Sequence, residues 1–255
     1  MKTTIKEELD VALESPILLE GLPGLGMVGR IAIKYIINQL NAQQLGLLYS
    51  PHFPYYVVVN KKGSVRLLRG EFHYWKNPEG SDLILFTGDS QAQTVEGQYE
   101  IAEAILDFAK KQNVSSIITL GGYRKEAGES PKVVATASDE SILSKAVEAD
   151  ALPSPPGNPI VGTAGLLVGM ARFRKLPALC LLGETRGYLP DPKAAKSLLL
   201  VLKKMLRISL DLNDIEKEIE KSNGILERMQ AIESRRETYA KKMRKGEEDK
   251  TTYIS

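Results

Sequence analysis

Residues 17–30 read Ile17-Leu-Leu-Glu-Gly21-Leu-Pro-Gly24-Leu-Gly26-Met-Val-Gly29-Arg30 and place a glycine-rich turn between an apolar strand and an apolar helix. Gly24, Gly26 and Gly29 match the G-x-G-x-x-G pattern, which in this context is typical of dinucleotide-binding proteins. That pattern also requires an Asp or Glu about 20 residues later to bind the ribose hydroxyls. No carboxylate occurs between residues 20 and 71. The sequence therefore predicts a tight strand-to-helix turn and no nicotinamide or flavin cofactor.

Two glycine turns are candidate anion-binding sites, because the backbone amides at the start of a helix attract anions. A second turn, 121–122, follows another apolar run at the sheet edge where α/β proteins bind ligands. Arg124 or Lys125 could meet a phosphate there. The candidate residues are Gly24, Gly26, Gly29, Gly121 and Gly122. The alternative is that these glycines only allow sharp turns that pack against neighbouring strands, and the sequence leaves both interpretations open.

The rest of the chain alternates short apolar runs with helical patterns. Strands are expected at 17–20, 45–49, 83–88, 116–120 and 178–183, and helices at 27–40, 97–112, 165–174 and 192–208. Asp191-Pro192 is a strong helix start, with Asp as N-cap and Pro at the first helical position. Residues 55–60 and 65–69, joined by Lys61-Lys-Gly63-Ser, predict a hairpin. We expect an α/β fold over residues 1–208 with a mainly parallel sheet, flanking helices and a hairpin insertion.

The chain changes character at residue 209, where charges become dense and proline disappears. Apolar positions then step by three and four residues, as in a heptad seam with one polar position. They are Leu212, Ile215, Ile219, Ser222, Leu226 and Met229. We expect a long amphipathic C-terminal helix over residues 209–245 with a partner-facing stripe. A flexible tail is expected at 246–255.

Composition narrows the class of protein. The 255 residues are 43% hydrophobic and 26% charged, with a formal net charge of +2, so no bias toward nucleic acid or a membrane is expected. The basic run 235–245 lies among acidic residues and is interpreted as a solvated helix face. One cysteine, no signal peptide and no apolar run of membrane-spanning length indicate a cytoplasmic protein.

Few side chains in the sequence have neighbours that would suggest catalysis or metal binding. His52 and His73 do not stand at metal-ligand spacing, so no metal site is expected. Glu184 and Asp191 could form a general acid and base pair. The alternative is that Asp191 caps a helix and that Glu184 pairs with Arg186. Cys180 is interpreted as a core residue.

Four segments together resemble the proteasome assembly chaperone family, in particular its archaeal homologues. They are Glu20-Gly-Leu-Pro-Gly-Leu-Gly-Met-Val-Gly-Arg30, Ile118-Thr-Leu-Gly-Gly-Tyr123, Gly157-Asn-Pro-Ile-Val-Gly-Thr-Ala-Gly-Leu-Leu-Val-Gly169, and Gly183-Glu-Thr-Arg-Gly-Tyr188 with Asp191-Pro-Lys-Ala-Ala195. The resemblance spans residues 15–208. It implies a phosphorylase-like α/β fold and a protein without catalytic activity. Such a protein is expected to form homo-oligomers and to help proteasome α subunits assemble.

The resemblance also implies a role for the last residues. Members of this family that act on the proteasome often end in a hydrophobic residue, a tyrosine and any residue, and this tail docks between neighbouring α subunits. The sequence here ends Tyr253-Ile254-Ser255, so its tyrosine stands third from the end rather than second, after Thr252. The sequence leaves two interpretations of the tail. In one, the α ring binds Tyr253, Ile254 and Ser255, and in the other the tail binds nothing.

The sequence thus favours a non-catalytic, homo-oligomeric chaperone that binds proteasome α subunits or a related assembly factor. The alternative is a nucleoside phosphorylase- or hydrolase-like enzyme that binds an anionic ligand at the glycine turns. A structural homo-oligomer with another protein partner is a third possibility.

Overall fold

The structure is a computed structural model, and it describes residues 2–125 and 130–224. Its main sheet has the strand order β1-β3-β6-β7-β2-β8-β11-β9-β10. The strands of this sheet are β1 (Thr4–Glu7), β2 (Ile17–Glu20), β3 (Gln43–Tyr49), β6 (Gly70–Trp75), β7 (Leu83–Gly88), β8 (Ser116–Arg124), β9 (Val133–Ala137), β10 (Leu152–Pro153) and β11 (Ala178–Thr185). A separate two-stranded sheet consists of β4 (Val57–Val59) and β5 (Val65–Leu67).

The centre of the sheet is parallel and its flanks are largely antiparallel. Strands β7, β2, β8 and β11 run parallel to one another. On one side β1, β3, β6 and β7 pair antiparallel, and on the other side β9 runs antiparallel to β11. The mainly parallel sheet expected from the sequence is therefore correct only for the central strands. The antiparallel flanks arise because β3, β6 and β7 follow one another without a helical crossover, which antiparallel pairing does not need.

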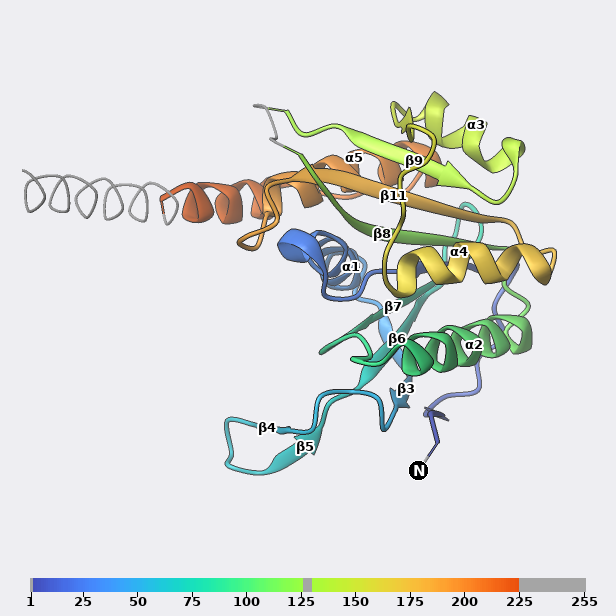
Figure 1. Cartoon of the computed structure of the whole chain (residues 1–255), viewed down its shortest axis with the longest axis vertical. Coiled ribbons are helices and arrows are strands. Elements are labelled where there is room, and N and C mark those ends of the chain that lie inside the picture. Colours follow the sequence, from blue (N-terminus) through green and yellow to red (C-terminus); the bar gives the residue numbers. More distant parts are fainter. Residues whose placement is uncertain (1, 126–129, 225–255) are drawn as a thin grey trace, which may run out of the picture.

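Helices cover both faces of this sheet (Figure 1). One face packs against α1 (Val28–Gln39), α3 (Glu140–Glu148) and α5 (Pro192–Leu206), and the other against α2 (Val95–Lys111) and α4 (Thr163–Phe173). Strand β2 shows how the sequence builds two cores, because adjacent strand residues point to opposite faces. Leu18 lies fully buried in the core under α2 and α4, and Leu19 lies fully buried in the core under α1 and α5.

The helix starts follow local signals in the sequence. Thr94 caps α2 by accepting a hydrogen bond from the backbone N–H of Gly97, and Asp191 caps α5 by accepting one from Ala194. Asp139 caps α3 in the same way, through Ser141 and Ile142. Helix α3 and strand β9 were not predicted from the sequence, although the Asp139 cap was a signal that could have found the helix.

The segment after α5 differs from the continuous helix expected from residue 209. Arg207 adopts a left-handed conformation (φ 54°) and ends α5, and residues 208–212 are not helical. Helix resumes at residues 213–224. The physical reason is that Ile208, Leu210 and Ile215 are buried in the core beneath α1 and α5, which requires the chain to turn back onto the domain.

Candidate functional site

The segments that carry the motifs meet at the carboxyl ends of β2, β8 and β11. Parallel pairing of β8 with β11 places Gly122 beside Gly183 and Tyr123 beside Glu184. The glycine-rich turn, a 3-10 turn at Leu25–Met27 followed by α1, lies against the same edge. This motif edge is the place where open α/β sheets bind ligands.

Close packing accounts for several glycines of the motif edge. A Cβ on Gly29 would lie 2.1 Å from the carbonyl oxygen of Leu120, and one on Gly122 would lie 2.4 Å from that of Leu25. A Cβ on Gly21 would lie 2.3 Å from the carbonyl oxygen of Gly29. Gly29 thus lets the start of α1 touch β8, Gly122 lets β8 touch the 3-10 turn, and Gly21 lets the end of β2 touch α1.

The other candidate glycines differ in what surrounds them. Gly26 has φ +58°, a conformation that favours glycine, and its carbonyl accepts a hydrogen bond from the backbone N–H of Asp191. A Cβ on Gly121 would meet only the end of the Leu182 side chain, at 2.9 Å. One on Gly24 would make an ordinary contact with Gln91 at 3.7 Å. Anion binding at Gly24, Gly26, Gly29, Gly121 and Gly122 stays a prediction, and packing explains most of these glycines without a ligand.

Both carboxylates considered for catalysis are engaged with the protein itself. Glu184 accepts hydrogen bonds from Lys125 Nζ at 2.8 Å and from the backbone N–H of Lys132 at 3.0 Å. Burial acts to raise its pKa, but these two bonds outweigh burial and leave the pKa below its usual value. Its ion-pair partner is Lys125 and not Arg186, which the sequence had suggested. Asp191 accepts from Thr185 Oγ1 at 2.7 Å while it caps α5.

The cations considered for phosphate binding also have protein neighbours. Lys125 pairs with Glu184, and the hydrogen bond between them raises the pKa of Lys125. The guanidinium of Arg124 lies 5.0 Å from the centre of the Tyr188 ring, in cation–π range. Lys125 and Arg124 are therefore both engaged with neighbouring side chains of this edge.

Sequence reasoning missed Glu20, the residue that ends β2. Its side chain is fully buried; Oε1 accepts a hydrogen bond from the backbone N–H of Leu22, and Oε2 has no partner among the described residues. Burial raises its pKa to about 8, so the carboxyl is largely protonated at neutral pH. The same effect raises the pKa of the nearby Cys180 thiol to about 12, which makes it an inert core residue.

His52 is hydrogen-bonded to other side chains of the protein, and His73 is half-buried. His52 lies between Thr94 Oγ1, 3.0 Å from Nδ1, and Glu100 Oε2, 3.1 Å from Nε2. Hydrogen bonds from Thr3, reinforced by His52, lower the pKa of Glu100 to about 2. His73 is half-buried, and burial lowers its pKa. Within residues 2–125 and 130–224, no three His, Cys, Asp or Glu side chains come together as a metal site.

Only part of the expected partner-facing stripe can be placed. Ile215 is fully buried against its own domain, so its side chain stabilises the monomer instead of facing a partner, and the partly buried Leu212 packs on the same core. This corrects the assignment of Ile215, because the chain turns back onto α5 and α1. Ile219 is partly exposed. Leu226, Met229, Tyr253, Ile254 and Ser255 lie outside the described residues.

No helix in the described part of the chain is long and apolar enough to cross a membrane.

Comparison with known proteins identifies the family. Residues 18–230 match the sequence profile of the PAC2 family. The chain belongs to the PAC2 family. The uncharacterized protein MJ1210 of Methanocaldococcus jannaschii is 32% identical over 222 residues, which cover 87% of this chain and 85% of that protein. Together with the two solved structures described next, this match confirms the resemblance to the proteasome assembly chaperone family that the sequence showed.

Two solved structures of PAC2 relatives from Pyrococcus furiosus extend the comparison. PbaB, described as an archaeal proteasome activator, has a TM-score of 0.86 and 35% identity, over 90% of this chain and 99% of PbaB. PbaA, described as an archaeal homolog of proteasome-assembly chaperone, has a TM-score of 0.74 and 27% identity, over 98% of this chain and 99% of PbaA. The mixed α/β fold of this chain is therefore that of archaeal PAC2 relatives.

Proposed function

We propose that this chain is a non-catalytic, homo-oligomeric protein that binds proteasome α subunits and acts in proteasome assembly or activation. The observation that carries the proposal is the likeness to PbaB and PbaA over nearly the whole chain. The motif edge supports the non-catalytic part, because Glu184, Asp191 and Lys125 are engaged in internal bonds. A protein-binding role needs no free catalytic group.

The partner-binding residues are proposed from the sequence beyond the core. Ile219, Leu226 and Met229 continue the apolar stripe after Leu212 and Ile215 reach the domain core. The end of the sequence, Tyr253-Ile254-Ser255, offers an aromatic and an aliphatic side chain for a pocket on the α ring. In this proposal the α/β body forms the oligomer and the C-terminal residues reach the partner.

Light scattering tests the proposal directly. The mass of the purified protein is measured alone and after mixing with proteasome α subunits from the same source. A defined oligomer that shifts to a larger complex supports the proposal. An oligomer whose mass does not change with α subunits would move the function to another protein partner, and a monomer would remove the oligomeric part.

A truncation separates the tail from the body. Deletion of residues 246–255 is expected to weaken binding of α subunits and to leave the oligomer mass, corrected for the deletion, unchanged. The matched variants are Tyr253→Ala and Tyr253→Phe, of which only the first removes the aromatic ring. Undiminished pull-down of α subunits by the truncated protein would exclude a role for the tail.

An activating role is a second candidate, favoured by the greater similarity to PbaB than to PbaA. It is tested by adding the protein to assembled proteasome and following peptide hydrolysis. A rise in hydrolysis that requires residues 246–255 indicates activation. Accelerated assembly of isolated α subunits without that rise indicates a chaperone.

The enzyme alternative is tested by ligand-induced stabilisation. A specific ligand at 100 times its Kd stabilises a folded protein by about 2.7 kcal/mol. Phosphate, nucleosides and dinucleotides are screened by thermal shift, since these are the ligands that the glycine turns could hold. A shift abolished by Arg124→Ala would favour the enzyme over the chaperone.

A further inference from the structure

The hairpin formed by β4 and β5 exposes an apolar face that the domain does not cover. Val57 pairs with Leu67 and Val59 with Val65, so these four side chains lie on one face. Their exposed fractions are 46%, 52%, 64% and 63% respectively. Figure 1 shows the hairpin projecting from the sheet, away from the helices. Strand residues that face solvent are usually polar. This face of the hairpin instead exposes valine and leucine on both strands.

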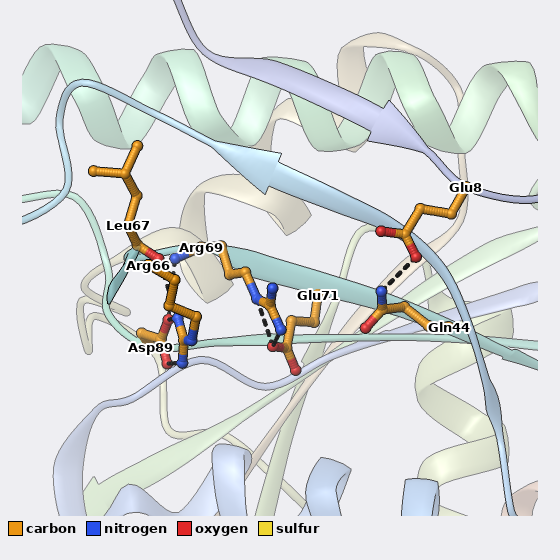
Figure 2. A network of polar contacts seen from close by, with 7 residues as sticks. All are labelled: Glu8, Gln44, Arg66, Leu67, Arg69, Glu71 and Asp89. Carbon is orange, nitrogen blue, oxygen red and sulfur yellow. Dashed lines mark hydrogen bonds and ion pairs between the residues drawn. The ribbon is translucent and has the colours of Figure 1, made fainter. Parts of the chain in front are cut away.

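The base of the hairpin is fixed to the domain, so the face is held in a defined orientation. The guanidinium of Arg66, at the centre of β5, forms two hydrogen bonds to the carboxylate of Asp89, which follows β7 (Figure 2). Asp89 also accepts a hydrogen bond from the backbone N–H of Arg69, at 3.1 Å, and Arg69 pairs with Glu71 on β6. Leu68 is buried just beyond β5.

The apolar surface continues from the strands to the base of the hairpin. Tyr55 is 100% exposed and Tyr56 is 59% exposed. A cavity of about 270 Å³ opens beside them, with Phe53 and Leu67 among its lining residues. The two tyrosines thus add exposed aromatic rings at the base of the hairpin, beside the four exposed aliphatic side chains. Contiguous exposed apolar side chains of this kind are often functional.

We propose that this face packs against the same face of a second copy of this chain, with the two hairpins face to face and their tips pointing in opposite directions. The inference rests on the homo-oligomer of the proposed function and assigns it an interface. Two-stranded sheets packed in this way lie about 10 Å apart, with their apolar side chains interdigitated. Each hairpin supplies the same patch, as a two-fold interface requires.

Charge favours a second copy as the occupant. The face itself contains no charged side chain, so two copies meet without like-charge repulsion. The tip contains Lys61 and Lys62, and the base contains Tyr55 and Tyr56. With the tips pointing in opposite directions, the lysines of one copy lie over the tyrosines of the other, an arrangement that permits cation–π contacts. Two copies in this arrangement therefore bring apolar side chains against apolar side chains and place each pair of lysines away from the other pair.

The patch is of the right order for a central contact. A standard interface takes about 800 Å² from each partner, and the four exposed aliphatic side chains with the two tyrosines would form its apolar centre. Interface cores are enriched in tyrosine and depleted in charge relative to the rest of the surface. The hairpin meets both conditions, with its two lysines at the rim.

A cysteine cross-link tests the contact in the full chain. Cys180 is the only natural cysteine and is fully buried, so an introduced exposed thiol reacts alone. Val59→Cys is treated with a bis-maleimide that spans about 10 Å, the separation of packed sheets. Phe173→Cys is the control, because Phe173 is 90% exposed and ends α4 rather than belonging to the hairpin. The Val59→Cys protein is expected to form dimers at least ten times faster than the control, and equal rates would overturn the proposal.

A mass measurement distinguishes this proposal from the function on which it rests. The double variant Val59→Lys/Val65→Lys is expected to have a smaller mass in solution than the wild type while it keeps the circular dichroism spectrum of the folded protein, and Phe173→Lys is expected to keep the full mass. A wild-type oligomer that the double variant leaves intact overturns the hairpin interface and leaves the proposed oligomer standing. A wild-type monomer overturns both, and loss of α-subunit binding without a change of mass assigns the face to a different protein.

Discussion

The motif edge and the β4–β5 hairpin are opposites in how their sequence relates to their surroundings. The edge holds most of the recognisable motifs, yet Gly29, Gly122, Glu184 and Asp191 are all in contact with the domain itself. The hairpin matches no motif, yet it exposes valine, leucine and tyrosine. Motifs in this chain thus mark places where backbones approach closely, whereas the hairpin face that we propose as a contact is recognised by its exposure.

The largest expected effect tests the claim that the glycines of the motif edge are packing residues. Gly29→Ala would place a Cβ 2.1 Å from the carbonyl oxygen of Leu120. Because the obstacle is backbone and cannot rotate away, we expect a loss of about 3 kcal/mol or more in the free energy of unfolding. Chemical denaturation monitored by circular dichroism measures the loss.

Gly169→Ala is the matched control for this substitution. Gly169 lies in α4, and a Cβ there would meet no atom within 4 Å. Alanine in a helix interior is favoured over glycine by roughly 0.5–1 kcal/mol, so this variant should be as stable as the wild type or slightly more so. Equal stability of Gly29→Ala and Gly169→Ala would contradict close packing and reopen the glycine turn as a ligand site.

The next effect concerns Glu20, the buried carboxyl of the same edge. Its pKa is about 8 in the folded protein and has the ordinary value near 4.5 when unfolded. Below pH 4.5 both states are protonated; between pH 4.5 and 8 only the unfolded state ionises, so stability falls as pH rises. The slope approaches about 1.4 kcal/mol per pH unit, or about 2 kcal/mol from pH 5 to 6.5.

Comparison of Glu20→Gln with the wild type isolates this contribution. The variant cannot ionise at residue 20, so the difference between the two unfolding free energies should change with pH in the direction stated. Urea denaturation at pH 5 and at pH 6.5 measures it. A difference that is the same at both pH values would mean that Glu20 is not protonated in the folded protein.

A smaller effect is expected at the anchor of the hairpin. Burial acts to raise the pKa of Asp89. The hydrogen bonds from Arg66 and from the backbone of Arg69 together lower the pKa by more than burial raises it, so the net pKa lies below the usual value. The carboxylate therefore stabilises the fold above its unfolded pKa, and this stabilisation is lost as pH falls through the folded pKa. For Asp89→Asn we expect about 1 kcal/mol of destabilisation at neutral pH, together with faster proteolysis at the hairpin. Unchanged proteolysis would show that Leu68 alone holds the hairpin.

The smallest effect on folding is expected at the hairpin face. Val65→Thr keeps a β-branched side chain at an exposed strand position, so the free energy of unfolding should change by less than about 0.5 kcal/mol. Its thermal unfolding curve is compared with that of Ile84→Thr, which places a hydroxyl at a fully buried position of β7. A loss at Val65 as large as that at Ile84, and independent of protein concentration, would mean that the chain's own domain already covers the hairpin face.

The elements that could be predicted were those with local signals. The Asp191-Pro192 start of α5, the turn before α1 and the central strands β2, β7, β8 and β11 lie where the sequence placed them, within a few residues. The antiparallel flanks could not be predicted, because the direction of a strand depends on its neighbour and not on its own residues. The ion pair of Glu184 with Lys125 was likewise hidden, because the residues are 59 positions apart.

By itself the sequence determined the α/β alternation, the sharp glycine turn at 21–29 and the kinship with proteasome assembly chaperones, since each depends on residue types at short spacing. Only the tertiary structure decided that Glu20 is a buried, protonated acid, that Ile215 belongs to the domain core and that the hairpin face is exposed. Burial and exposure are set by segments that are distant along the chain. A short stretch of sequence cannot record which of its apolar side chains those segments will cover.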